Sequence, residues 1–171
     1  MSHVRQQIRD YAANLLISFI YDRFGIVIQD RFGANLSPRV GEDLLSTGTM
    51  YKFRKYALDD AQLPALCVYT TNDVTSLATM GNRTLLHNLE LRVDVINKGS
   101  SINIFENIEG FCAELNSAFE TDYTFRGLVK SCVLAQSDFS VNTTGEKAIG
   151  IGKMIFDVRY MTAIDNCQVS I

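Results

Sequence analysis

The most restrictive feature of this sequence is a long run of alternating apolar and polar residues at 85–96. One set of alternate positions is apolar (Leu85, Leu89, Leu91, Val93 and Val95), and the other is polar or charged (Asn88, Glu90, Arg92 and Asp94). Successive side chains of a strand point to opposite faces of its sheet, so the pattern predicts one buried and one wetted face. Such a strand is typical of an antiparallel sheet that packs other elements against one face only.

Residues 148–163 show the same alternation and are predicted to form another long strand. A turn signal at 142–146 precedes them, because Gly145 takes positive φ freely, and it predicts a hairpin with a strand at 128–141. Further strands are expected at 50–57 and 65–71. The first is charged and predicted to be peripheral, whereas the second is apolar on both faces and predicted to be central.

Two segments, 2–23 and 102–120, repeat their apolar residues with helical spacing. We therefore predict an α+β fold in a single domain, 1–171. Its mainly antiparallel or mixed sheet has about five strands, two helices pack on one face, and the order is α-β-β-β-α-β-β. Residues 24–48 are rich in glycine and turn formers, and predict a long loop or extended hairpin, with a short strand allowed at 26–29.

The composition restricts the class of function. A net charge of −3 argues against a dedicated nucleic-acid binder. No apolar run approaches the ~20 residues that cross a bilayer, and the first residues lack the apolar stretch of a signal peptide, so neither a membrane segment nor export is expected. The four cysteines, Cys67, Cys112, Cys132 and Cys167, are then expected to be buried free thiols rather than disulfides.

No arrangement of residues in the sequence predicts catalysis. The only histidines, His3 and His87, have no neighbours at metal-ligand spacing, and His87 is interpreted as an ordinary strand residue. Nucleophile, phosphate-loop and dinucleotide motifs are missing. We therefore expect no enzyme activity, no cofactor and no metal.

A group of basic residues is the clearest candidate for contact with a partner. Arg31 and Arg39 lie in the long loop segment, and Lys52, Arg54 and Lys55 lie in the strand that follows. They predict either a basic patch that faces an acidic partner or DNA, or the solvated charges of an edge strand. The carboxylates of Asp59 and Asp60 lie on the next connection, where they either contact a neighbouring subunit or solvate the loop.

The segment 58–70, LDDAQLPALCVYT, follows this strand directly. Pro64 has no N–H to donate, so it suits the start of the central strand and no deeper position. The segment resembles one in the tail terminator proteins, also called minor tail or tail completion proteins, of long-tailed bacteriophages. The stretches MSHVRQQIRD, LLHNLELRVDV and GEKAIGIGKMIFDVRYMT resemble the first helix, the central strand and the closing strand of that family.

The resemblance implies a structural protein of the virion that forms a six-fold ring. In that family the ring caps the tail tube, ends polymerisation of the major tail tube protein and offers a surface to head completion proteins, while DNA passes through the lumen without sequence-specific binding. It implies assembly in the host cytoplasm and a final place at the head–tail interface. Two alternatives stay open: a head–tail connector or neck protein of similar fold, and a small enzyme of unrecognised type.

Overall fold

The computed structural model describes residues 3–24, 27–30, 47–52, 63–78, 83–99, 104–142, 148–163 and 166–170. Helix α1 (Val4–Phe24) is followed by strands β1 (Val27–Asp30), β2 (Thr47–Tyr51), β3 (Ala65–Leu77) and β4 (Thr84–Gly99). Helix α2 (Ile104–Thr121) then precedes β5 (Ser131–Asn142), β6 (Ala148–Ala163) and β7 (Asn166–Ser170).

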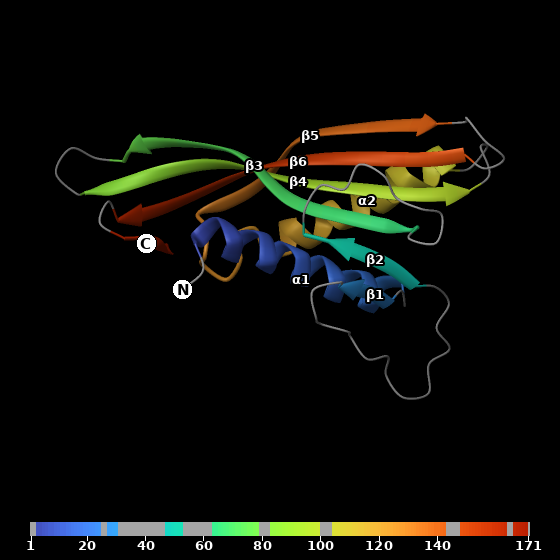
Figure 1. Ribbon diagram of the computed structural model, residues 1–171, viewed down its shortest axis with the longest axis horizontal. Helices are drawn as coiled ribbons and strands as arrows, with labels where there is room; N and C mark the ends of the chain where they lie inside the picture. Colours follow the sequence, from blue (N-terminus) through green and yellow to red (C-terminus); the bar gives the residue numbers. More distant parts are fainter. Residues whose placement is uncertain are drawn as a thin grey trace.

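Within these residues the strands form one open mixed sheet in the order β1-β2-β3-β4-β6-β5, with β7 paired to β6 (Figure 1). The β1–β2 and β2–β3 pairs are parallel, and all other pairs are antiparallel. The predicted α+β fold with two helices on a mixed sheet is confirmed. The short strands β1 and β7 extend the predicted sheet of about five strands.

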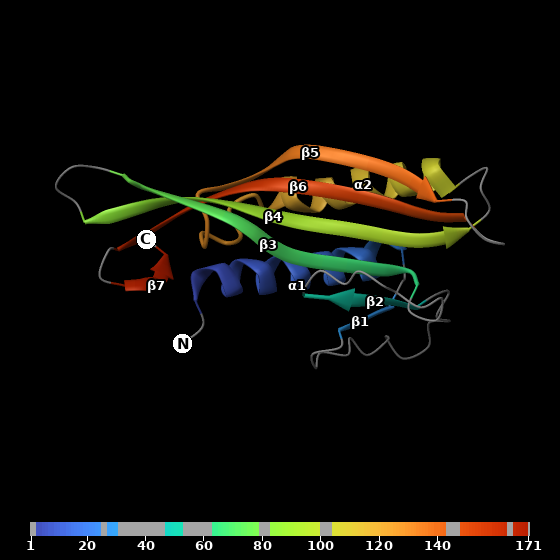
Figure 2. The ribbon, with the colours of Figure 1, turned by 45° about the horizontal axis from the view of Figure 1, so that its top comes forward.

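Both helices cover the same face of the sheet (Figure 2). Alternate residues of β4 and β6, among them Leu91, Val93, Phe156 and Val158, are buried with the apolar stripes of α1 and α2 in one core. Apolar burial of this kind stabilises the fold by roughly 25 cal/mol per Å². The one-sided burial predicted from the alternation at 85–96 is therefore found.

One expectation about the first strands needs correction. β2 does not lie at the periphery, because β1 pairs along its outer side. β1 and β2 pair in parallel, and the long loop or extended hairpin at 24–48 stays a prediction. Residues 31–46 and 53–62 lie outside the described part of the chain. The strand at 65–71 is interior as predicted, with Ala65–Tyr69 buried on both faces.

β3 continues well beyond its predicted end and forms a projecting structure with β4. After an irregularity between Thr70 and Asp73, residues 73–77 of β3 pair with residues 85–89 of β4. We call residues 73–77 and 84–89 the β3–β4 arm. Figure 1 shows the arm extending past the N-terminal end of α1.

Candidate functional site

Of the predicted contact residues, the structure describes Lys52 alone. Its Nζ lies 3.7 Å from Oδ1 of Asp10 in α1, and its side chain is 18% exposed. Lys52 therefore lies against the first helix and is largely covered. Arg31, Arg39, Arg54, Lys55, Asp59 and Asp60 lie outside the described residues, so the basic patch and the paired carboxylates stay predictions.

A buried polar cluster lies where the β3–β4 arm leaves the body of the sheet. His87, 7% exposed, is at its centre, and its ring stacks on Tyr160 with centroids 4.4 Å apart. Nδ1 of His87 is 3.2 Å from Oδ1 of Asp73, and Nε2 is 2.9 Å from the Thr162 hydroxyl. The Tyr160 hydroxyl donates to Oδ2 of Asp73 at 2.8 Å. With its proton on Nδ1, the ring donates to the carboxylate and accepts from the threonine hydroxyl.

Helix α1 joins this cluster through Arg5. Its Nη2 donates to the carbonyl of Thr71 at 3.0 Å, and its Nε lies 3.8 Å from Oδ2 of Asp73. The register explains the rest of the arrangement, because His87 pairs with Thr75 on one side and with Tyr160 on the other. The cluster thus connects the first turn of α1 with three strands.

The order carboxylate, imidazole, hydroxyl is also the order of a Ser-His-Asp catalytic triad. A nucleophile must reach its substrate, however, and Thr162 is 0% exposed. We therefore interpret Asp73, His87 and Thr162 as a structural link between the arm and the core. Sequence reasoning missed this cluster, because its members lie on three strands and only the strand register brings them together.

The face of the sheet that points away from the helices carries charges that are paired within that face. Glu90 accepts hydrogen bonds from Arg92 at 3.0 Å, the Asn72 amide at 3.1 Å and the Thr71 hydroxyl at 2.9 Å. These donors, Arg92 foremost, lower the pKa of Glu90. The Tyr69 hydroxyl likewise donates to Asp94 at 3.0 Å. Glu90 and Asp94 therefore each have a hydrogen-bond partner within this face.

The two edges of the sheet, in contrast, present exposed apolar side chains. We call these edges the open sides of the sheet. Val74 and Leu77 in the β3–β4 arm are 63% and 65% exposed, and Val133 in β5 is 60% exposed. β2 pairs with β3 at Ala65–Cys67, so residues 68–77 have no strand on that side among the described residues. On the opposite side, β5 ends the sheet along residues 149–159 of β6, and β7 pairs with β6 beyond it at Thr162 and Ala163.

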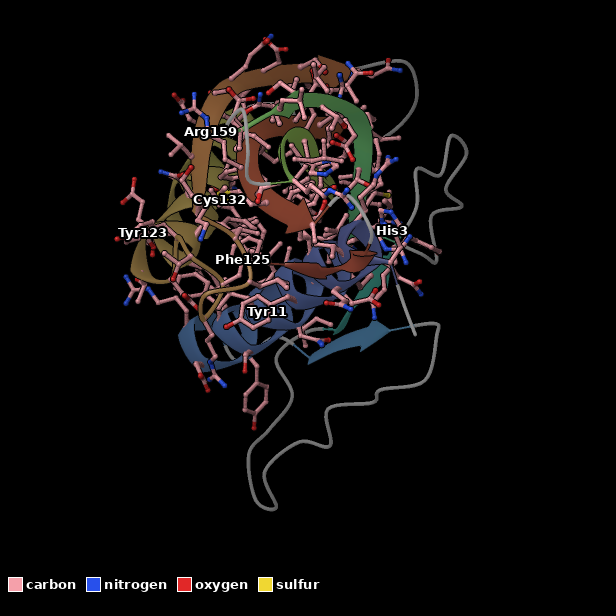
Figure 3. All side chains as sticks on the ribbon, turned by 90° about the vertical axis from the view of Figure 1, so that its left-hand side faces the viewer. His3, Tyr11, Tyr123, Phe125, Cys132 and Arg159 are labelled. Carbon is pink, nitrogen blue, oxygen red and sulfur yellow. The ribbon has the colours of Figure 1, made fainter. Side chains whose placement is uncertain are left out.

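A groove of about 500 Å³ lies beside β5, between this strand and the C-terminal end of α2. Its lining includes Phe119 and Glu120 of α2, Tyr123 of the following loop, and Cys132 and Leu134 of β5. Tyr123 is 55% exposed and lies at the periphery in Figure 3, whereas Phe125 lies inside, against Tyr11. The groove is therefore open to solvent, with the buried Phe119 and Cys132 at its base and Glu120 on its helix side.

A second hollow, of about 310 Å³, lies at the start of α1 and is lined by polar residues that include His3, Arg5 and Arg9. Across the described residues, no three or more His, Cys, Asp or Glu side chains are placed to hold a metal ion. Cys67, Cys112 and Cys132 are buried free thiols, as predicted, and the side chain of Cys167 lies outside the description. Neither described helix is long and apolar enough to span a membrane.

No protein-family model and no curated protein matches this chain. The geometry of the fold is therefore the observation from the structure that bears on function. In the described part of the chain, the two open sides of the sheet are the surfaces best suited to contact another protein.

Proposed function

We propose that this chain is a structural subunit of a long-tailed bacteriophage that forms a ring at the end of the tail tube. The ring ends polymerisation of the tube protein and provides the surface to which the head attaches. The proposal places the assembled protein at the head–tail interface of the virion. It is supported by the resemblance of four segments to tail terminator proteins and by the geometry of the sheet.

The observation that carries the proposal is that the two open sides of the sheet differ from each other. One side is the β3–β4 arm with Val74 and Leu77, and the other is β5 with Val133 and the groove. A ring needs a heterologous interface, in which one patch of each subunit contacts a different patch of the next. Two unlike surfaces on opposite sides of one sheet meet that requirement.

The proposed role requires no catalytic residue. The only arrangement with catalytic connectivity among the described residues is the His87 cluster, and its hydroxyl is inaccessible. The proposed partners are other copies of the chain, six to a ring, the major tail tube protein on one face of the ring and a head completion protein on the other. DNA passes through the lumen and makes no sequence-specific contact.

The test is assembly with the tube protein encoded in the same genome. Light scattering of the purified protein, alone and with that tube protein, is expected to detect a ring-sized species. Added to polymerising tube protein, it is expected to stop tube growth and to appear at tube ends in electron micrographs. A protein that stays monomeric under both conditions contradicts the proposal, and a ring that binds the portal but not the tube favours the neck-protein alternative.

A further inference from the structure

We propose that, in the ring, the β3–β4 arm of one copy pairs with β5 of the next copy, so that the sheets join edge to edge. This inference rests on the proposed function and names the surfaces that form the ring. The occupant of the free side of β5 is thus a second copy of this chain. Three properties of the two edges, argued in turn, support the pairing.

The first property is strand direction. β3 is antiparallel to β4, β4 to β6 and β6 to β5, so β3 and β5 run in opposite directions. When two copies stand side by side in the same orientation, β3 of one therefore meets β5 of the other as an antiparallel pair. Antiparallel ladders are slightly more stable per residue than parallel ones. Repetition of this step is a head-to-tail arrangement, which closes into a ring if its rotation allows.

The second property is the position of the apolar residues along the strands and the face of the sheet to which they point. Val74 pairs with Asn88, which pairs with Arg159, while Val133 pairs with Asp157, only two residues away along β6. Both valines point to the face away from the helices, because Asn88 and Asp157 alternate with buried residues of the core face. In the joined sheet, Val74 and Val133 of neighbouring copies lie on one face as cross-strand neighbours.

Leu77 occupies the opposite face of the arm. It pairs with Leu85, which pairs with Thr162 on the helix side of the sheet. The groove between α2 and β5 lies on that same side, with Phe119 and Leu134 in its lining. With Val74 opposite Val133 in an antiparallel pair, Thr75 lies opposite Cys132 of the groove, and Leu77 lies opposite Lys130, just before β5.

The third property is charge. β5 contains one charged residue, Asp138, in its 12 residues. Long edge strands with few charges readily pair with another chain, and monomeric proteins usually protect them. An irregularity between Leu134 and Gln136 divides β5, and Val133 lies in the segment 131–134 before it.

Cross-linking tests the pairing directly. Val74→Cys and Val133→Cys are introduced together, with Cys167→Ser, and treated with a short bismaleimide. Burial raises the pKa of the Cys112 and Cys132 thiols to about 12, so these native cysteines react slowly at neutral pH. The double variant is expected to give a ladder of covalent multimers, and each single variant is expected to give none. Covalent dimers from Val133→Cys alone would indicate a symmetric β5–β5 contact and overturn the proposal.

Lysine substitutions give an independent test. Val133→Lys and Leu77→Lys are expected to raise the protein concentration needed for half-assembly about tenfold or more, because each buries a charge in the joint. Asn14→Lys, at an exposed position of α1, is the matched control and is expected to change nothing. Urea unfolding of each variant verifies that the subunit still folds.

The outcomes separate the interface from the function. Rings that form normally with both lysine variants, and give no cross-link between residues 74 and 133, overturn the interface and leave the proposed function intact. Multimers that show the cross-link but never close into rings or stop tube growth support the interface and contradict the function. A strict monomer that gives no cross-link, alone or with tube protein, contradicts both.

Discussion

At the scale of single residues, the cluster around His87 shows how the arm is anchored. The Asp73 carboxylate receives the hydroxyl of Tyr160, which is 0% exposed, at 2.8 Å and the His87 ring at 3.2 Å. Asp73→Ala removes the acceptor of the Tyr160 bond and one of the two partners of His87 Nδ1, the other being the Thr75 hydroxyl at 3.2 Å. The loss is expected to reduce the free energy of unfolding by about 1–3 kcal/mol. Urea unfolding of Asp73→Ala, Tyr160→Phe and the double variant measures these free energies. A coupling energy of about 0.5–3 kcal/mol is expected between the two positions. Additive effects would show that the hydrogen bond contributes nothing specific.

Asp122 links the pH dependence of stability to the loop after α2. The Tyr11 hydroxyl, which donates at 2.6 Å, and then the backbone N–H of Arg126, at 3.0 Å, lower the pKa of Asp122 below its ordinary value of 3.8. These bonds hold a loop in which Phe125 and Arg126 have positive φ. Because the folded pKa is the lower one, the stability from Asp122 is present above about pH 4 and is lost as the pH falls through the folded pKa.

Two variants test this assignment. Tyr11→Phe removes the largest cause and is expected to raise the pKa of Asp122, which an NMR titration of its carboxyl group measures. Asp122→Asn is expected to be less stable than the wild-type protein at neutral pH and to lose less stability between about pH 5 and pH 2. An unchanged carboxyl titration in Tyr11→Phe would contradict the role given to the hydroxyl.

At the scale of elements, the packing of α2 on β6 depends on Gly152. A Cβ at this position would lie 2.6 Å from Sγ of Cys112 and 2.9 Å from Cγ2 of Ile108, both in α2. Gly152→Ala is therefore expected to reduce the free energy of unfolding by about 1–3 kcal/mol, measured by urea unfolding. Adding Cys112→Ala removes the nearest atom and is expected to recover part of that loss.

Gly110→Ala is the matched control, because nothing lies within 4 Å of a Cβ at this helical position. Alanine favours a helix over glycine, so a gain of roughly 0.5–1 kcal/mol is expected. A Gly152→Ala protein as stable as the wild type would show that α2 moves away from the sheet at little cost.

The elements that could be predicted from the sequence are those whose one-sided burial gives the sequence a repeating pattern of apolar residues. The one-sided strands at 85–96 and 148–163 and the two apolar helical stripes are of this kind. The second half of β3, with Asn72, Thr75 and Ser76, has no such pattern. It is a strand because it pairs with β4, and not because it is buried in the core. The His87 cluster was hidden for the same reason, since only the register places Asp73 and Thr162 beside the ring.

At the scale of the whole molecule, two kinds of surface could carry assembly, and salt distinguishes them. The open edges offer backbone pairing and exposed apolar residues, such as Val74 and Val133. The outer face offers charges, such as Glu90 and Arg92, that already pair with each other.

Raising the ionic strength from about 0.1 M to about 1 M shortens the Debye length from about 10 Å to about 3 Å and weakens exposed charge contacts. Rings built through the edges are expected to stay assembled over this range, measured by light scattering at constant protein concentration. Dissociation at high salt, reversed on dilution of the salt, would instead assign assembly to the charged face of the sheet.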